Sequence, residues 1–366
     1  MSSNQFDLAV FGSGPSALYL AALLAEGQTR RIVLIHNPAT RVRLPRSFEL
    51  SAGFIARPET WRLLTAGSAE TARRLSTAGL GGALERSRLT LARTGASGRF
   101  ALGHVRALAS AHGAEIERAS LPPNPEWDAT GHAAHGLLLR EVWRFAPERA
   151  HDAFLAWHNK LGIERLPRAQ TDEIAIGRDG ALRLTAGSQR IAADLAVLAD
   201  DEFILDFAGG AELEAGFRIE QRTALLTAPT ADRLPDRAAF LLAEDFALHQ
   251  APSGAIAAVG AGAPGPLAER ILRLMPALAS AGIAGRARFA GLASLDGAAQ
   301  IGRGKSRRAF VVGGLGETGF FLMPSLARFI AGAAEGQEKA FWSARAIGRD
   351  RATRVDEIAA PIAGAS

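Results

Sequence analysis

The chain has 366 residues, of which 48% are hydrophobic and 22% are charged, a composition that is typical of globular proteins and excludes an intrinsically disordered chain. Its formal net charge is +5, and only three of its 42 basic residues are lysines. These basic residues are scattered among acids along the sequence, whereas a nucleic-acid partner requires them on one face, so we expect no such partner. The absence of cysteine excludes disulfides and thiolate catalysis.

The most apolar stretch lies near residues 309–334 and contains Glu317, Arg328 and several glycines. A lipid-facing helix does not tolerate this pattern, so we expect no membrane-spanning segment. The N-terminal "MSSNQFD" lacks the basic region of a signal peptide. We therefore predict a cytoplasmic protein without a membrane partner.

A strand–turn–helix–strand unit is predicted at the N-terminus. Residues 6–11 form an apolar run, residues 15–24 carry small and apolar side chains at helical spacing, and "RRIVLIH" (30–36) is a second buried strand. The turn between them, Gly12-Ser13-Gly14-Pro15-Ser16-Ala17, has the GxGxxA pattern. Gly12 permits a sharp turn, Gly14 lets a pyrophosphate approach the backbone, and Ala17 allows close packing of helix on strand. This pattern predicts dinucleotide binding at a helix N-terminus.

The remaining elements alternate between helices and strands. Helical spacing predicts helices over 59–85, 146–162 and 266–279, and residues 121–127 are expected to form a loop. Strands are predicted over 88–95 and 254–262, and hairpins over 172–200. A final strand, glycine turn and helix span 307–332. This second turn, Gly314-Leu315-Gly316-Glu317-Thr318-Gly319, suggests a cofactor held at both ends by helix N-termini.

The C-terminal segment "VVGGLGETGFFLMPSLARFIAG" resembles the FAD-contacting segment of the D-amino-acid oxidase / glycine oxidase superfamily. "GLASLDGAAQIGR" (291–303), "LSAGFIARP" (50–58) and "RIAADLAVLAD" (190–200) also resemble segments of that family, in the same order. The resemblance implies an α/β fold: a discontinuous, Rossmann-like FAD-binding domain and a second domain built on an antiparallel sheet that binds substrate. We expect the FAD-binding domain in 1–85, 146–205 and 286–366, and the substrate domain in 86–145 and 206–285.

The two turns and the resemblance together predict the FAD contacts. They are Gly12, Gly14, Pro15, Ser16, Ala17, His36, Asn37, Arg43, Arg46, Ser51, Ala52, Gly53, Gly314, Gly316, Glu317, Thr318, Gly319 and Phe320. The family has an acidic residue where this chain has His36, which either hydrogen-bonds a ribose hydroxyl without the help of a charge or faces solvent. Asn37 is a second candidate for that role. Arg43 and Arg46 either reach the phosphates or are solvated loop residues.

Three positions depart from the family pattern. The family holds a substrate carboxylate with an arginine in a "GLRP…DG" segment, and residues 291–297 contain none. The family's helper tyrosine is also missing, because the single tyrosine, Tyr19, follows the first turn. In "VLADDEF" (197–203), Asp200 and Asp201 replace a small turn close to the cofactor, so their charges oppose FAD binding unless they turn outward.

Substrate contacts are therefore sought elsewhere. Arg218, Arg222 and His249 are the candidates, with solvent-facing or edge-strand positions as the alternative. Asp296 before Gly297 is typical of a turn. His132 and His135 lack a carboxylate partner, so we predict no metal site.

The sequence predicts an FAD-dependent oxidoreductase that oxidises an amine C–N bond to an imine by hydride transfer to flavin N5. Because the carboxylate anchors are missing, a non-standard or conjugated amine is expected rather than a free amino acid. Two alternatives remain open. One is a flavoenzyme that modifies a protein-bound or carrier-bound group, and the other is a non-catalytic FAD-fold subunit that works with a partner subunit.

Overall fold

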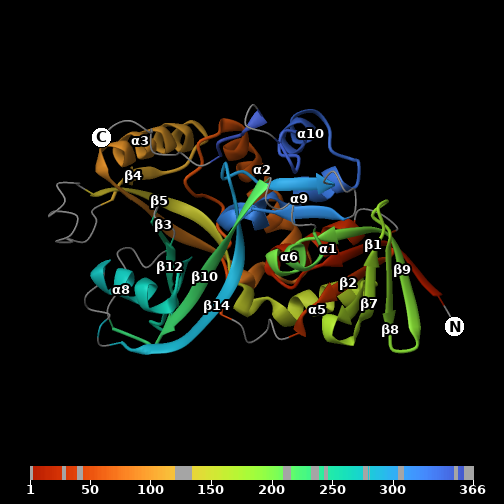
Figure 1. Cartoon of the computed structure of the whole chain (residues 1–366). Helices are drawn as coiled ribbons and strands as arrows, with labels where there is room; N and C mark the ends of the chain where they lie inside the picture. The colour runs from red at the N-terminus through yellow and green to blue at the C-terminus, as the bar shows by residue number, and fades with distance from the viewer. Residues whose placement is uncertain are drawn as a thin grey trace.

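The computed structural model describes residues 3–26, 30–38, 44–119, 134–208, 216–231, 239–242, 246–274, 279, 281–303, 309–349 and 353–357. Within these ranges the strands form two eight-stranded sheets, and helices pack on both (Figure 1). No helix of the described part is long and apolar enough to cross a membrane. The predicted α/β class, with one Rossmann-like sheet and one antiparallel sheet, is confirmed.

The first sheet is parallel at its centre, as the continuous apolar runs predict for strands covered on both faces. Its order is β15 (Gln300–Arg303), β16 (Phe310–Gly313), β9 (Gln189–Leu198), β1 (Ser3–Phe11), β2 (Ile32–His36) and β6 (Glu164–Pro167). The strands from β16 to β6 run parallel. The hairpin of β7 (Asp172–Ile176) and β8 (Leu182–Ala186) adds to β9 in antiparallel fashion.

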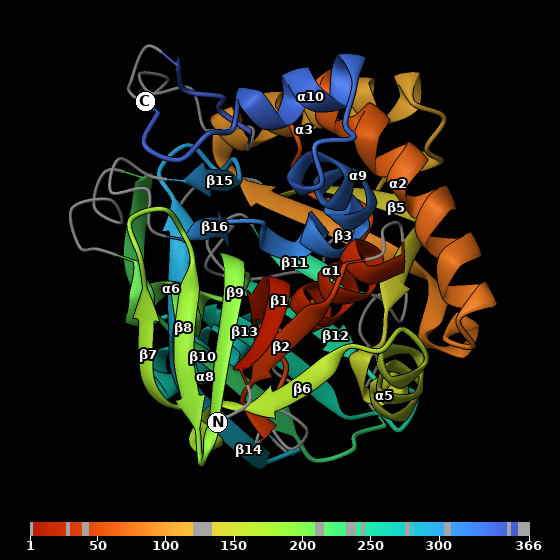
Figure 2. The same ribbon diagram turned by 90° about the vertical axis from the view of Figure 1, so that its right-hand side faces the viewer.

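Helices cover both faces of this sheet (Figure 2). Leu8 and Val10 of β1 belong to a core cluster that includes α1 (Pro15–Glu26) and α9 (Gly319–Ile330). Phe11 points to the other face, where its ring packs edge-on against Phe203 of α6 (Asp201–Phe207). The period-2 alternation of β1 thus supplies apolar side chains to two cores at once. The other helices around these cores are α2 (Pro58–Thr77), α5 (His151–Lys160) and α10 (Gly336–Ser343).

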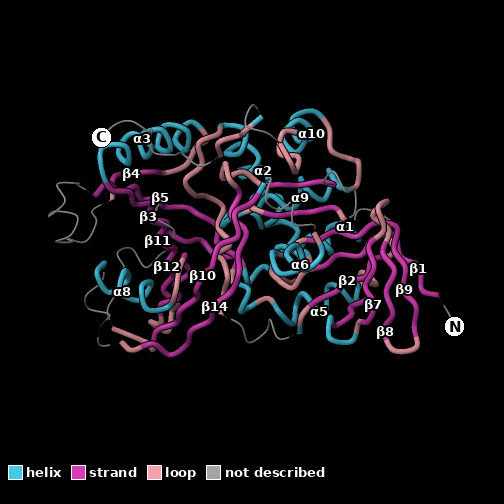
Figure 3. Tube along the Cα trace, in the orientation of Figure 1, coloured by secondary structure: helices cyan, strands magenta, loops and turns pink. Residues whose placement is uncertain are grey.

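The second sheet is antiparallel except where β11 meets β3. Its order is β14 (Ile283–Ser294), β10 (Phe217–Thr227), β13 (Ile256–Ala261), β12 (Phe246–Gln250), β11 (Ala239–Leu242), β3 (Leu84–Thr94), β5 (Ala134–Phe145) and β4 (Ile116–Arg118). Helices α3 (Gly95–Ala111) and α8 (Pro264–Leu274) accompany it. The long pair β10 and β14 runs side by side through the middle of the molecule and reaches α6 of the first sheet (Figure 3).

Several element boundaries differ from the sequence prediction. The helix predicted over 59–85 ends at Thr77, because Gly79 adopts a positive φ of 80° and the chain then enters β3 at Leu84. The helix predicted over 146–162 divides into a short 3₁₀ turn at Pro147–Arg149 and α5. Helices α3, α6 and α10 were not predicted. The loop expected at 121–127 lies outside the described residues.

Candidate functional site

The carboxyl ends of four neighbouring parallel strands meet at one edge of the first sheet. Gly12 follows β1, Asn37 follows β2, Asp200 follows β9 and Gly314 follows β16. Ligands of open α/β sheets bind at such an edge, outside the carboxyl ends of the strands. The strand order therefore brings both predicted glycine turns to one place, although some three hundred residues separate them in the sequence.

The first glycine turn joins β1 to α1 by the close packing that the GxGxxA pattern predicts. A Cβ atom at Gly12 would lie 2.2 Å from the Cβ atom of Ala17, so only glycine fits there. The Gly12 N–H donates to the Ile35 carbonyl of β2, at 3.0 Å. Pro15 is the first residue of α1, where its missing N–H costs no hydrogen bond.

A carboxylate of the chain itself lies on this turn. Asp200 Oδ2 accepts hydrogen bonds from the N–H groups of Ser13, at 2.5 Å, and Gly14, at 3.0 Å. A Cβ atom at Gly14 would lie 3.1 Å from Asp200 Oδ1. The side from which glycine lets a phosphate approach the backbone is thus taken by Asp200. The sequence left open whether Asp200 turns outward, and the structure shows that it turns inward.

Three consecutive acids at the start of α6 bind three different segments. Besides Asp200 on the first turn, Asp201 Oδ2 accepts from the Leu292 N–H of β14, at 3.0 Å. Glu202 Oε1 accepts from Asn37 Nδ2, at 3.3 Å, and its other oxygen pairs with Arg46, also at 3.3 Å. The start of α6 therefore ties together the turn after β1, the loop after β2 and the second sheet.

The second glycine turn needs glycine for its backbone conformation. Gly314 and Gly316 have φ values of 65° and 57°, in the left-handed region that favours glycine. At Gly319 a Cβ atom would lie 2.6 Å from that of Leu315. The Glu317 carboxylate accepts from the Phe48 N–H, and the Glu317 carbonyl accepts from the Leu50 N–H, at 2.7 Å. This turn is therefore closed by the loop that precedes α2.

The loop at residues 51–53 makes structural contacts of its own. Ser51 Oγ accepts from the Trp143 N–H of β5, at 2.9 Å, and the Ser51 N–H donates to the Trp143 carbonyl, at 2.9 Å. Ala52 is buried. A Cβ atom at Gly53 would meet Thr318 at 3.8 Å, an ordinary packing distance. This loop thus connects the second glycine turn to the second sheet.

Glu49 adds a buried carboxyl group that the sequence analysis missed. It accepts from the hydroxyls of Ser47, at 2.9 Å, and Ser16, at 3.5 Å. Burial raises the pKa of Glu49 to about 8, and the negative charges of Glu317 and Asp200 add to this rise. The one available signal in the sequence was a single acid among the uncharged, mostly apolar residues of "SFELSAGFIA".

Glu49, Asp200, Asp201 and Glu317 together form what we call the acid cluster. Burial raises the pKa of Glu317 to about 7 and that of Asp200 to about 6, and it also raises the pKa of Asp201. The hydrogen bonds from backbone N–H groups act in the opposite direction but are outweighed. Protonated or charged, these groups occupy the edge of the sheet where a dinucleotide would lie.

Two predicted arginines lie beside the acid cluster. The Arg222 side chain crosses Gly291, where a Cβ atom would lie 2.7 Å from Arg222 Cδ, and its charge lowers the pKa of both Asp201 and Glu317. Arg46 lies over the Phe289 ring, 5.1 Å from its centroid, and its charge acts on Asp200. Arg43 lies outside the described residues.

The other two predicted substrate residues, Arg218 and His249, lie on strands of the second sheet. Arg218 pairs with Glu220 on β10, and its side chain is 66% exposed. His249 is buried on β12 with its ring 5.9 Å from that of Phe48, and burial, assisted by Arg144 and Arg149, lowers its pKa to about 3. His249 also lines a depression of about 500 Å³ on the second sheet. Glu220 brings the two predicted arginines together, because its second carboxylate oxygen lies 4.0 Å from Arg222. No contact among the described residues joins His249 to either arginine.

His36 and the aromatic residues near the turns have clear packing roles. Burial, together with the charges of Arg165 and His151, lowers the pKa of His36 to about 4, so its imidazole is neutral at pH 7. The Phe320 ring stacks between Tyr19, at 4.8 Å, and Phe145, at 4.1 Å, and is fully buried. Phe320 and Tyr19 therefore belong to the core between α1 and α9.

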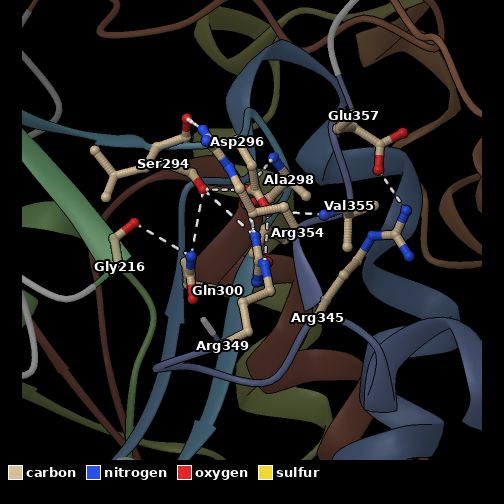
Figure 4. Close-up of polar contacts among 12 residues, drawn as sticks. Gly216, Ser294, Asp296, Ala298, Gln300, Arg345, Arg349, Arg354, Val355 and Glu357 are labelled. Atoms are coloured by element: carbon tan, nitrogen blue, oxygen red, sulfur yellow. Dashed lines mark hydrogen bonds and ion pairs between the residues drawn. The ribbon is translucent and has the colours of Figure 1, made fainter. Parts of the chain in front are cut away.

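The segment that resembles the family's substrate-arginine loop holds a buried ion pair (Figure 4). The Gly297 N–H donates to the Ser294 carbonyl, so the turn predicted at Asp296 is confirmed. Arg349 donates to both Asp296 oxygens, at 2.7 and 2.5 Å, and to the carbonyls of Ala298 and Ala299. Burial would raise the pKa of Asp296, but Arg349 and the Val355 N–H outweigh it and hold the pKa below its usual range. The sequence analysis missed this pair.

Solved structures share this fold over nearly the whole chain, whereas no family model and no curated protein matches the sequence. An L-proline dehydrogenase from P. horikoshii superimposes with a TM-score of 0.70 at 13% sequence identity. The match covers 92% of this chain and 96% of the dehydrogenase chain. The chain has the amino-acid-oxidase fold. A glycine oxidase from Geobacillus kaustophilus gives 0.67 at 15% identity, over 91% and 96%. An iminodiacetate oxidase from Chelativorans sp. BNC1 gives 0.66 at 13% identity, over 91% and 98%. The predicted resemblance is thus confirmed at the level of the fold.

The backbone and the side chains of this site differ in their fit to FAD. The glycine turns, the helix N-terminus and the strand order provide the frame that a dinucleotide requires. The side chains do not fit its pyrophosphate in the arrangement described, because Asp200 binds the N–H groups of the turn and Glu49 takes the hydroxyl of Ser16. A negatively charged phosphate next to the Asp200 carboxylate would be repelled.

Proposed function

We propose that the chain is an FAD-dependent oxidoreductase that oxidises the C–N bond of an amine. The observation that carries the proposal is the fold, which extends over more than 90% of this chain and of the proline dehydrogenase, glycine oxidase and iminodiacetate oxidase structures. The convergence of two glycine turns at the carboxyl edge of one parallel sheet supports it. The FAD-binding domain in this proposal comprises 1–85, 146–205 and 286–366, and the substrate domain comprises 86–145 and 206–285.

FAD can bind this site only if the Asp200 carboxylate leaves the first turn. The N–H groups of Ser13 and Gly14 each donate one hydrogen bond, and both now go to Asp200. Protonation of Asp200 would remove its charge but would not clear the space beside Gly14. The proposal therefore requires the start of α6 to move away from the turn when FAD binds.

The substrate in this proposal lacks a free α-carboxylate. Two described cations near the segment 291–297 lie beside carboxylates of the chain, because Arg349 binds Asp296 and Arg222 lies near Glu220, Asp201 and Glu317. A substrate carboxylate buried without a cation would cost several kcal/mol, on the order of an unpaired buried charge. An N-substituted amine, or an amine conjugated to a larger carrier, avoids that cost.

A second candidate function is a non-catalytic subunit that keeps the FAD fold without using FAD. The specific observation in its favour is the position of Asp200, which satisfies the turn without a cofactor. In that case a partner subunit would carry the chemistry.

The visible absorption spectrum of freshly purified protein tests both candidates. Flavin bands, with near-stoichiometric FAD released by heat, support the oxidoreductase. The next measurement is bleaching of the flavin without oxygen by a panel that pairs each amine with the amino acid that carries the same side chain. Bleaching by the amines only is the expected result. A colourless protein that takes up no added FAD contradicts the oxidoreductase and favours the subunit.

A further inference from the structure

Asp200 lies at a helix start but does not cap its own helix. It occupies the N-cap position of α6 with extended φ and ψ of −134° and 146°, and its side chain makes no cap hydrogen bond. Aspartate at this position usually accepts from N–H groups of its own first turn. Here the carboxylate instead reaches the turn that precedes α1, which is 187 positions away in the sequence.

The environment of this carboxylate is the one that a phosphate would have. Two backbone N–H groups point at one oxygen of Asp200, Oδ2. The other oxygen lies beside Gly14, where the Cβ atom of any other residue would be. The N-terminus of α1 adds the positive end of its helix dipole, which stabilises any anion placed there. A carboxylate and a phosphate oxygen therefore compete for the same donors.

The contacts of the next two residues couple this position to the rest of the edge. Asp201 is held by the Leu292 N–H of β14, and Glu202 is held by Asn37 and Arg46 in the segments that follow β2. In a dinucleotide-binding protein the cofactor joins such segments. In this chain the start of α6 joins them.

We propose that Asp200 is a built-in occupant of the phosphate position at the first glycine turn, which closes this edge of the sheet without a dinucleotide and competes with one for binding. The proposal deepens the proposed function and rests on it, because it assigns the site to a dinucleotide. Replacing Asp200 should open the site.

Three variants of the full chain separate occupancy from charge. Asp200→Gly removes the carboxylate and the volume that the side chain fills. The backbone at position 200 is extended, a conformation that any residue can adopt, so the substitution introduces no backbone strain. Asp200→Asn removes the charge and keeps an oxygen that can accept from the turn. Asp206→Asn is the matched control, because it removes one acid from the exposed side of the same helix.

The measurement is the dissociation constant of each variant for FAD and for ADP, by fluorescence quenching and by calorimetry. We expect Asp200→Gly to bind both at least about tenfold more tightly than the wild type, which corresponds to about 1.4 kcal/mol. Asp200→Asn should gain less, and Asp206→Asn should stay within about twofold. The same gain with ADP as with FAD would place the effect at the phosphates and not at the flavin ring.

Two results would overturn the proposal. One is unchanged affinity of Asp200→Gly for both ligands, and the other is an equal gain in Asp206→Asn. If Asp200→Gly does not fold, Asp200→Asn decides, and its failure to bind more tightly than the control counts against occupancy. The outcomes for the two proposals stay distinct. If Asp200→Gly binds FAD but no amine bleaches its flavin, the result supports Asp200 as occupant of the phosphate position and contradicts the amine oxidoreductase. If the wild type already binds FAD as tightly as Asp200→Gly and an amine bleaches it, the result supports the oxidoreductase and contradicts the role of Asp200.

Discussion

Two aspartates in this molecule, the half-buried Asp200 and the buried Asp296, are held by different kinds of partner. Asp296 is paired with Arg349 through two short hydrogen bonds, and this pairing holds its pKa below the usual range. The hydrogen bonds that Asp200 accepts from described residues come from backbone N–H groups, and burial raises its pKa to about 6 although the charge of Arg46 opposes this. From this comparison we expect Asp296, which is paired with an arginine, to stay in place, and Asp200, which is held by backbone N–H donors, to be exchangeable for another anion.

The largest effect is expected when the matched pair is broken. Arg349→Ala leaves Asp296 buried without its cation, so we expect unfolding free energy to fall by about 3–5 kcal/mol. Urea denaturation followed by circular dichroism measures it. Arg354→Ala is the control, because this half-exposed arginine donates to the Leu295 carbonyl and makes a loose, exposed pair with Asp356, so its loss should cost under about 1 kcal/mol. Equal losses in the two variants would show that Asp296 does not depend on Arg349.

A smaller loss of stability is expected at the other aspartate. Asp200→Gly leaves the Ser13 and Gly14 N–H groups without their acceptor, which should cost about 1–3 kcal/mol in the absence of ligand. Excess ADP should restore part of the melting temperature in this variant and not in the wild type, as thermal denaturation can show. A variant as stable as the wild type without ligand would mean that Asp200 does not hold the turn.

The acid cluster predicts that stability falls as pH rises from 6.5 to 8. Glu49 and Glu317 have folded pKa values of about 8 and 7, above their unfolded values, so the folded chain holds protons that the unfolded chain has already released. Their contribution is lost as pH rises through the folded pKa, by about 1–2 kcal/mol in total. Below pH 6.5 His36, His158 and His249, whose pKa values are lowered by burial, act in the opposite direction. Chemical denaturation at several pH values in this range measures the slope of the unfolding free energy against pH.

Glu49→Gln should flatten that slope, since the amide keeps the shape of the side chain and does not titrate. The control is Glu141→Gln, which removes a half-exposed acid of a surface pair on β5 and should leave the slope as in the wild type. A slope that persists in Glu49→Gln would assign the pH dependence to other groups.

The smallest effects distinguish the two arginines of β10. Arg218→Ala removes an exposed pair with Glu220 and should change unfolding free energy by less than about 0.5 kcal/mol. Arg222→Ala removes the cation beside Asp201 and Glu317, and a loss of about 1 kcal/mol is expected, with a rise in the pKa of both acids. Equilibrium denaturation of the two variants at pH 8 gives the difference. If Arg218→Ala is the more harmful, the assignment of Arg222 to the acid cluster is wrong.

Much of the frame could be predicted from local patterns in the sequence. The run from β1 through the first turn to α1, and the run from β16 through the second turn to α9, each depend on neighbours within about six residues. Gly12 is required by Ala17, and Gly314 by its positive φ. These are steric constraints that operate along the chain, so the pattern of residue types carries them. The buried apolar runs likewise determined the parallel sheet.

Only the tertiary structure decided what occupies the site. Asp200 and the first turn are 187 positions apart, and Arg349 and Asp296 are 53 apart. The direction in which each side chain points depends on how distant elements pack, which no local pattern records. Glu49 was missed for the same reason, because its burial comes from the meeting of two turns and a loop. The sequence by itself determined a frame for a dinucleotide, and the packing of α6 placed a carboxylate where the phosphate was expected.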